Sequence, residues 1–187
     1  MTESNGDVRL GVLCGSLRKA SHSQLLARCL PDHAPVGVTI VQLPTIGALP
    51  HFNQDLMTEE GNPASVAELA AAISDLDGMI IVSPEYNWSI PGALKNALDW
   101  LSRLEPMPMR NLPVMIVTSS PGLLGGARAH PPIRNILHSL DCRILARPEV
   151  QIAQVAKKLD HEQQRISAPE TVDFIASRLA AFAAFAR

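Results

Sequence analysis

The sequence predicts an α/β protein with a doubly wound, five-stranded parallel sheet that is covered by helices on both faces. Three observations support this class. Short apolar runs alternate with segments of helical periodicity along the 187 residues. Alternation of this kind is typical of a parallel sheet buried between two helical layers. No repeat, low-complexity tract or linker interrupts it, so residues 1–187 are expected to form a single domain.

The elements follow one another in strand–helix order. Strands are expected at Val8–Cys14, Val36–Leu43, Gly78–Val82, Val114–Ser119 and Arg143–Arg147. Helices are expected at Ser23–Pro31, Pro63–Leu76, Ile90–Leu104, Ala127–Leu140 and Pro169–Ala186. Right-handed crossovers leave two strand orders to weigh, the flavodoxin-like order 2-1-3-4-5 and the longer six-stranded dinucleotide-binding fold. The number of units and the chain length favour the flavodoxin-like order.

Helical spacing justifies the two most regular helices. In the last one, Val172, Ile175, Leu179 and Phe182 share one face. In the third, an apolar face and a charged face are expected on opposite sides. The inward face comprises Leu94, Leu98 and Leu101, and the outward face Lys95, Asp99 and Arg103. Two connections, Pro44–Asn62 and Pro148–Ala168, are long enough to suggest functional loops.

Composition excludes several classes of function. Apolar residues make up 47% and charged residues 18%, and the net charge is −2, with no basic stripe for nucleic acid. The three cysteines, Cys14, Cys29 and Cys142, form no CxxC or Cys/His cluster, so neither a zinc site nor a disulfide framework is expected. The N-terminus MTESNGDV lacks an apolar signal core, and no run reaches the ~20 residues of a membrane helix. A soluble protein of a reducing cytoplasm is therefore expected, without metal or membrane partner.

The loop after the first strand, GSLRKASHS (residues 15–23), has the character of an anion site. It carries three serines, one Arg and one Lys and no acidic residue. In the predicted order it lies at the carboxyl edge of the sheet, where strand order reverses and ligands bind. Its hydroxyls and backbone N–H groups, with the N-terminus of the next helix, can surround a phosphate. The alternative is a solvated Ser-rich turn with an ordinary helix cap.

The residue sequence of this loop excludes other phosphate-binding motifs. It lacks both GxGxxG and GxxxxGK[ST], the signatures of dinucleotide and P-loop sites. A cysteine-phosphatase loop would place its Arg six positions after Cys14, where Ala20 stands; Cys14 is better interpreted as the buried end of a strand. The lack of a Walker lysine indicates a phosphate that is held and not transferred, as in flavin mononucleotide.

The loop after the third strand, SPEYNWSIPGALKNALDW (residues 83–100), faces the first across the predicted switch point. Pro84 and Pro91 stiffen it, and Tyr86, Asn87 and Trp88 lie between them. A rigid turn of this kind can read the edge of a flat heterocycle with its backbone groups. The alternative is that the two aromatics are ordinary half-buried side chains.

Taken together, GSLRKxSxx and PEYNxSIPGxLKNAxDW resemble the NADPH-dependent FMN reductase family, which includes quinone, azo-dye and chromate reductases. A third segment, TSSPGLLGGAR (residues 118–128), resembles the family's loop after the fourth strand, which touches the flavin ring. The resemblance implies a flavodoxin-like fold, bound FMN, and NADPH or NADH as hydride donor. It also implies small-molecule electron acceptors and a homodimer or homotetramer, with Asn53, Gln54 and Asp55 near the subunit interface.

The same resemblance implies the site residues. The phosphate is expected on Ser16, Arg18, Ser21 and Ser23, with Leu17, Lys19, Ala20 and His22 completing the loop backbone. The isoalloxazine is expected on Pro84, Glu85, Tyr86 and Asn87, with Ser119 touching it from the third loop. Ser23 stands where the family often has Asn, and Trp88 and Pro121 are further departures. Arg128 is a candidate for binding a nucleotide 2′-phosphate.

The implied reaction is hydride transfer from NAD(P)H through FMN to quinones, azo compounds, chromate or free flavin, by a ping-pong sequence. Because the flavin carries that chemistry, no catalytic side chain is predicted. His130 and His138 lack a partner carboxylate or nucleophile in the sequence and are expected to be solvated or at an interface. Two alternatives are a flavodoxin-type electron carrier, against which the small net charge argues, and a regulatory domain that has lost its cofactor.

Overall fold

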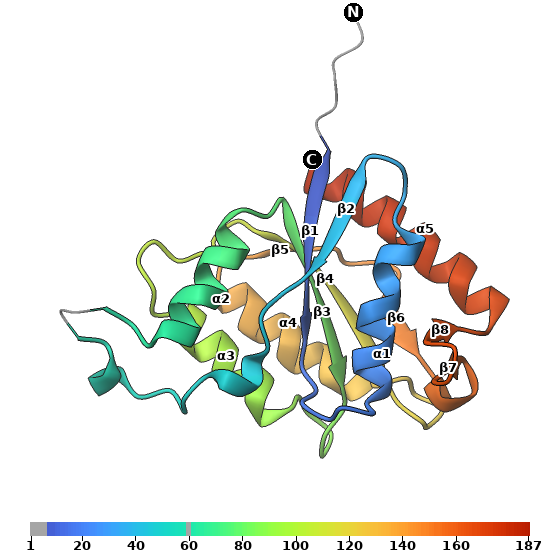
Figure 1. Ribbon diagram of the computed structural model, residues 1–187, viewed down its shortest axis with the longest axis horizontal. Coiled ribbons are helices and arrows are strands. Elements are labelled where there is room, and N and C mark those ends of the chain that lie inside the picture. Colours follow the sequence, from blue (N-terminus) through green and yellow to red (C-terminus); the bar gives the residue numbers. More distant parts are fainter. Residues whose placement is uncertain (1–6, 59–60) are drawn as a thin grey trace, which may run out of the picture.

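The computed structural model describes residues 7–58 and 61–187. The first six residues, which belong to the polar N-terminus, and residues 59 and 60 of the long second connection lie outside the described residues. The parallel sheet contains β1 (Val8–Cys14), β2 (Val38–Gln42), β3 (Gly78–Pro84), β4 (Pro113–Ser119) and β5 (Arg143–Ile144). Their order is β2-β1-β3-β4-β5, which confirms the predicted flavodoxin-like order (Figure 1).

The far edge of the sheet differs from the prediction. β5 has two residues instead of the five predicted, and it pairs only with Pro113 and Val114 at the start of β4. After a break, β6 (Val150–Ile152) pairs with the end of β4. Pro148 in the break has no N–H for a ladder hydrogen bond, which explains why pairing stops and resumes. The predicted fifth strand is therefore interrupted, and its second half lies in the segment predicted to be a loop.

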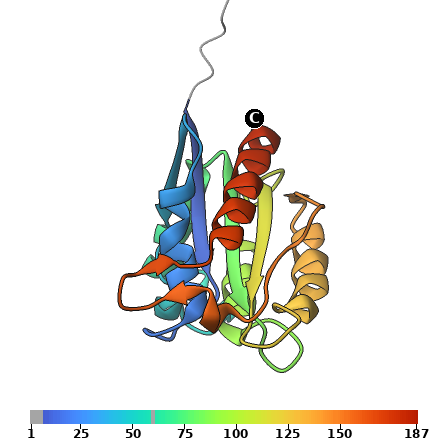
Figure 2. The ribbon, with the colours of Figure 1, turned by 90° about the vertical axis from the view of Figure 1, so that its right-hand side faces the viewer.

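The remainder of that predicted loop is also structured. The antiparallel pair β7 (Leu159–Asp160) and β8 (Arg165–Ile166) forms a small hairpin. The hairpin lies beside the first helix, as the view in Figure 2 shows. Pro148–Ala168 is thus a connection that adds a strand to the sheet and a hairpin to its helical layer.

Helices cover both faces of the sheet. They are α1 (His22–Cys29), α2 (Ala64–Ser74), α3 (Gly92–Leu101), α4 (His130–Ser139) and α5 (Pro169–Ala186). The predicted helices agree in place with these, and prolines account for several starts: Pro63 and Pro91 are N-caps, and Pro169 is the first residue of α5. The predicted start of the fourth helix at Ala127 is a short 3₁₀ turn that leads into α4.

Two apolar clusters fill the space on either side of the sheet. One joins α1 and α5 to the sheet, and the other joins α2, α3 and α4 to the opposite face. Along β3, Ile80 and Val82 belong to the first cluster, whereas Met79 and Ile81 belong to the second. A strand that buries both faces has no polar positions to alternate with, which explains its continuous apolar sequence.

The third helix packs as predicted. Leu94, Leu98 and Leu101 are buried, whereas Lys95 donates to Asp99 on the exposed side at 2.6 Å and 2.8 Å. Trp100 is also fully buried, and its indole N–H donates to the carbonyl of Pro50 at 2.8 Å. The long second connection is thereby tied to α3.

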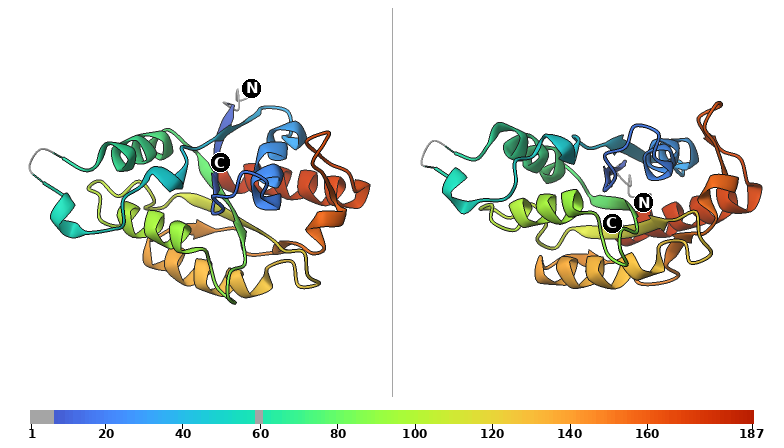
Figure 3. Two further views of the ribbon diagram at one scale, coloured as in Figure 1. Left: turned by 60° about the horizontal axis from the view of Figure 1, so that its bottom comes forward. Right: turned by 90° about the horizontal axis from the view of Figure 1, so that it is seen from below.

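The carboxyl ends of the central strands meet at one edge. In the sheet register Cys14 is opposite Val82, and Pro84 is opposite Ser119. The loops that follow β1, β3 and β4 therefore converge at this edge, which faces the viewer in the right-hand view of Figure 3. In the described ranges no helix combines the length and the apolar character that crossing a bilayer would require.

Candidate cofactor site

The first of these loops is held by its own backbone and by the start of α1. Gly15 N–H donates to the carbonyl of Val82 at 2.8 Å, which anchors the loop to the end of β3. Ser21 is the N-cap of α1, and its hydroxyl accepts a hydrogen bond from the N–H of Gln24 at 3.4 Å. The Gln24 side-chain amide in turn donates to the carbonyl of Ser16 at 2.6 Å. These bonds fix the loop against a helix N-terminus, a geometry that favours anions.

Ser16 provides an independent sign of a ligand. Its side chain is 1% exposed, and among the described residues its hydroxyl has no hydrogen-bond partner. Leaving a buried hydroxyl unsatisfied costs about 1–3 kcal/mol, so such groups are rare without a ligand or water. An orphaned hydroxyl inside an anion-favouring loop fits a phosphate oxygen as its missing partner.

Ser23 and Ser119 come together from separate elements. Their hydroxyl oxygens lie 3.0 Å apart, and both side chains are buried. Ser23 is the second residue of α1 and Ser119 the last of β4. The sequence had assigned the first to a phosphate and the second to a ring. Because the two hydroxyls are hydrogen-bonded to each other, the residue expected at the phosphate and the residue expected at the ring lie side by side.

The second loop forms a tight turn at its tip. Tyr86 and Ser89 exchange backbone hydrogen bonds of 3.0 Å and 2.9 Å, and the two residues between them, Asn87 and Trp88, have φ of 49° and 65°. Positive φ at both central residues is the type I′ pattern, which Asn tolerates and Trp rarely adopts. Trp88 is 73% exposed at this tip.

An Arg–Glu contact ties the second loop to the third. Arg128 donates its backbone N–H to a Glu85 carboxylate oxygen at 3.0 Å, and its guanidinium lies 3.5 Å from the other oxygen. The same guanidinium lies 4.5 Å from the centre of the Trp88 ring, which is a cation–π contact. Trp88 is therefore held in its strained conformation by a residue of the opposite loop.

The third loop folds back onto the sheet through two glycines. Gly125 and Gly126 have φ of 60° and 85°, and the carbonyl of Gly125 accepts a hydrogen bond from the Thr118 hydroxyl at 2.8 Å. A Cβ on Gly125 would lie 2.9 Å from backbone atoms of Gln151 and Ala153. The segment around β6, which was predicted as a loop, is thus the wall against which the third loop is placed.

The three loops enclose a hollow of about 110 Å³. Its lining residues are Arg18, Ser21, His22, Ser23, Pro84, Glu85, Tyr86, Ser119, Ser120, Pro121 and Val155. Most of the predicted site residues are therefore brought together. Ser120 and Val155 were not among them; Ser120 adjoins a predicted residue, but nothing in the sequence connects the distant Val155 with this site.

The remaining predicted residues, Ser16 among them, are not part of the lining of this hollow. Leu17 lines an adjoining apolar hollow of about 260 Å³, which shares Arg18 and Tyr86 with the first. Lys19, Ala20 and Asn87 are exposed. The side chains of these three residues point to solvent, so they could contact a ligand in the hollow only through their backbone groups or after a movement of their loops.

The nearby thiol and the imidazoles behave differently from ordinary exposed groups. Burial raises the pKa of the Cys14 thiol to about 11, so a thiolate nucleophile is disfavoured at neutral pH. His130 is 1% exposed, so the prediction that it is solvated was wrong, and its burial lowers its pKa. His138 is exposed.

Within residues 7–58 and 61–187 no cluster of three or more His, Cys, Asp or Glu is placed to hold a metal ion.

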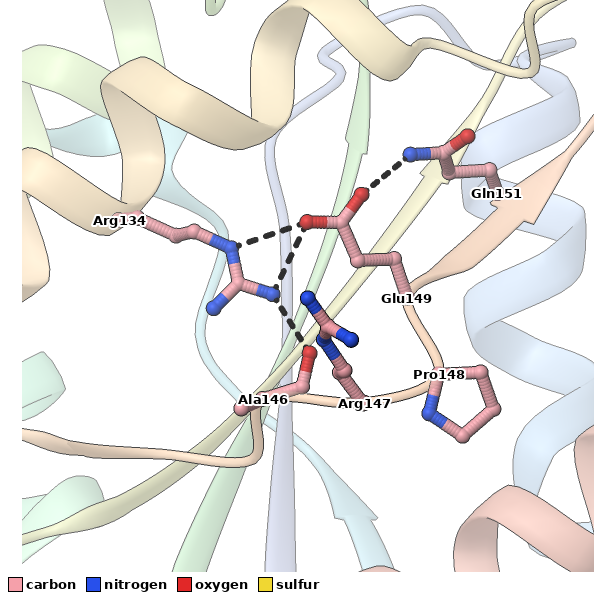
Figure 4. Close-up of a pocket in the computed structure, with 6 residues that line it drawn as sticks. All are labelled: Arg134, Ala146, Arg147, Pro148, Glu149 and Gln151. Atoms are coloured by element: carbon pink, nitrogen blue, oxygen red, sulfur yellow. Dashed lines mark hydrogen bonds and ion pairs between the residues drawn. The ribbon is translucent and has the colours of Figure 1, made fainter.

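A larger cavity, of about 640 Å³, is lined by Arg134 of α4 and by residues 146–149 and 151 around the start of β6 (Figure 4). Glu149 there accepts hydrogen bonds from Arg134 at 3.2 Å and from Gln151 at 2.6 Å, and Arg134 also donates to the carbonyl of Ala146. Its polar groups are thus largely paired with one another. The predicted site residues gather instead at the hollow between the loops.

Comparison with known proteins shows which family the chain resembles over most of its length. Residues 8–157 match the family described as NADPH-dependent FMN reductase. A quinone reductase of Escherichia coli (strain K12) is 43% identical over 173 residues, which cover 92% of each chain. A 2-hydroxy-1,4-benzoquinone reductase of Burkholderia sp. is 33% identical over 96% of this chain and 97% of its own. The structure of FerB, a flavoenzyme NAD(P)H:(acceptor) oxidoreductase of Paracoccus denitrificans, superposes with a TM-score of 0.86 at 30% identity, covering 96% of this chain and 97% of FerB.

Proposed function

The chain belongs to the NADPH-dependent FMN reductase family, and from this premise we propose that it is a quinone reductase that draws electrons from NAD(P)H through bound FMN. The single observation that carries this proposal is the hollow between the three loops. It combines an anion-favouring loop with the rigid 84–86 turn. The same loop carries the buried, unpaired hydroxyl of Ser16. FMN, when bound, accepts a hydride and passes electrons on, so the protein has only to hold and orient the reactants.

Each loop has a separate task in this proposal. Arg18, Ser21 and the N-terminus of α1 bind the phosphate, and the hydroxyl of Ser16 donates to one of its oxygens. Ser23 and Ser119 share one position and bind the same part of the cofactor, next to that phosphate. Pro84 to Tyr86 and the third loop border the flat ring, and the Glu85–Arg128 contact keeps their separation fixed.

The acceptor is proposed to enter from the adjoining apolar hollow. Leu17 and Tyr86 line it and are 52% and 42% exposed, so both offer apolar surface for a flat, uncharged ring. Quinones meet this description better than chromate, which is a compact anion. Azo compounds and free flavin are also flat and remain proposed acceptors, and the reducing cytoplasm remains the proposed location.

A homodimer, or a homotetramer built from it, is proposed as the working form. Asn53, Gln54 and Asp55 are exposed in the second connection, which is tied to α3, and Lys95 is exposed on α3 itself. Light scattering of the purified protein at micromolar concentration tests this, and a fully active monomer would contradict it.

The decisive experiment is a steady-state screen with purified, yellow protein. Quinones, azo dyes, chromate and free FMN are each tested with NADPH and with NADH. We expect quinones to give the highest kcat/KM, and parallel double-reciprocal plots because donor and acceptor occupy the same flavin face in turn. A colourless protein that binds no FMN would contradict the proposal. Slow bleaching of the bound flavin by free NADPH, in stopped flow, would favour the electron-carrier alternative.

A further inference from the structure

Two imidazole rings connect the loop after β1 and the start of α1 to the β7–β8 hairpin. Nδ1 of His22 lies 2.8 Å from Nε2 of His161, and the ring centres are 4.8 Å apart in an edge-on arrangement. His22 is the first residue of α1 and lines the hollow between the loops. His161 belongs to the connection between β6 and α5 and lies beyond residues 8–157, the part of the chain that matches the family.

The hairpin that carries His161 is fixed to α1 by further contacts. Arg28 of α1 donates to the side-chain oxygen of Gln164 at 3.0 Å, and the thiol of Cys29 lies 3.5 Å from the Gln164 carbonyl. The Gln164 side-chain amide donates to the carbonyl of His161 at 2.6 Å. Val155 of the same connection lines the hollow. The position of His161 beside α1 is therefore set by several contacts that are independent of its own ring.

The occupied nitrogen decides what His22 can offer a ligand. Its Nδ1 is engaged by His161, so Nε2 is the ring nitrogen that is left. If His161 donates, His22 is neutral with its proton on Nε2. If His161 accepts and His22 is cationic, Nε2 also carries a proton. Only the arrangement in which neutral His22 donates from Nδ1 leaves Nε2 bare, and an anion near Nε2 disfavours it.

We propose that His161 is a positioning residue that holds Nδ1 of His22, so that the protonated Nε2 of His22 donates to the phosphate of FMN. This inference rests on the proposed function, since it requires that FMN binds in the hollow. It assigns a role to the hairpin segment and to a side chain for which the sequence suggested only a backbone contribution.

The charges around His22 set the direction of proton movement. Burial, with His161 and Arg18 nearby, lowers the pKa of His22 below its usual value. The other charges of the hairpin partly compensate one another, because Asp160 lies 3.9 Å from Arg165, and Arg28 is bound to Gln164. The ring is thus largely neutral at pH 7 without ligand. A phosphate dianion opposes these effects, so binding of FMN should favour protonation of His22.

The test compares FMN with riboflavin, which lacks the phosphate. Dissociation constants are measured at pH 7 by flavin fluorescence on flavin-free enzyme for the wild type and for His22→Phe, His161→Phe and the double variant. We expect each single variant to bind FMN about 10-fold more weakly, the usual worth of one hydrogen bond to a charged group, and riboflavin within twofold of wild type. The double variant should bind FMN no more weakly than His22→Phe, because His161 acts through His22.

Phe preserves the ring contact, so a purely packing role of His161 would leave FMN affinity unchanged in His161→Phe, and that result overturns the inference. Equal losses for FMN and riboflavin, or additive losses in the double variant, overturn it as well. His138→Phe, an exposed imidazole on α4, controls for the loss of one His. If the wild type binds no FMN, the proposed function itself fails; if it binds FMN and only these differences are missing, this inference alone fails.

Discussion

Removing one hydroxyl of the Ser23–Ser119 pair tests how the first helix is joined to the end of β4. In Ser23→Ala the remaining Ser119 hydroxyl loses a partner at 3.0 Å while its side chain stays 2% exposed. An unsatisfied buried hydroxyl costs about 1–3 kcal/mol, and because both serines border a hollow that admits water we expect about 1–2 kcal/mol. In a protein of this size that corresponds to a fall in Tm of roughly 2–8 °C.

The assay is urea unfolding of the flavin-free protein at pH 7, followed by far-UV circular dichroism. Ser23→Ala, Ser119→Ala and the double variant form a cycle, and Ser139→Ala serves as a control. Ser139 is exposed at the end of α4, where its hydroxyl bonds only to its own helix. We expect the two single variants to lose similar free energy and the double variant to lose clearly less than their sum, because it leaves no orphaned partner.

The reasoning would be refuted by additive losses, which would mean that the hydroxyls do not interact. A Ser23→Ala variant as stable as the Ser139→Ala control would refute it equally. An unchanged m value across the set is required, so that the comparison concerns stability and not the compactness of the unfolded chain.

Three further predictions concern the loops and the buried imidazole. Arg18→Ala should weaken FMN binding by about 1.5–3 kcal/mol in a fluorescence titration, with Arg18→Lys restoring only part; a change within twofold would contradict a phosphate contact. Gly125→Ala should cost at least ~1–3 kcal/mol in urea unfolding, because its φ is 60° and the new Cβ would meet backbone atoms, whereas Gly122→Ala has room and should be nearly neutral. His130 has a lowered pKa, so below about pH 6.5 the unfolded chain binds a proton that the folded chain excludes, and the free energy of unfolding should fall as the pH drops from 7 to 5. His130→Leu should reduce that slope; an unchanged slope would assign it to other groups.

The central sheet was predictable because its strands are buried on both faces. β1, β3 and β4 each present a nearly continuous apolar run, which sequence patterns detect well. The edge was not predictable to the same degree. β6 has three residues, and its pairing with β4 depends on contacts more than thirty residues away in the chain. The sequence pattern of a few neighbouring residues does not show which distant strand they will pair with.

The candidate site divides in a similar way. The motifs predicted Arg18, Ser21 and Glu85 at this site, because each lies in a loop that follows a strand ending at the same edge. The position shared by Ser23 and Ser119 was missed, since only the packing of α1 against β4 brings them together. Asn87 was expected at the ligand, but the turn reverses there and carries it to the exposed tip.

The hairpin residues escaped prediction for another reason. Val155 and His161 lie in a segment with no recognisable pattern, and their place beside α1 results from the packing of the hairpin onto that helix. Sequence reasoning assigned this segment to a loop because its strands are only two residues long. Its contribution to the site is visible only when the fold is known.

The two tryptophans of the chain provide the molecule with two separate optical reporters. Trp100 is fully buried among the helices of one sheet face, where its surroundings change only when the fold is lost. Trp88 is 73% exposed beside the hollow, under the guanidinium of Arg128. Emission from the buried Trp100 is expected at short wavelength and should move to longer wavelength when the protein unfolds. Emission from the exposed Trp88 is expected at long wavelength already in the folded protein, so a change confined to that component reports an event at the loop tip and not loss of structure.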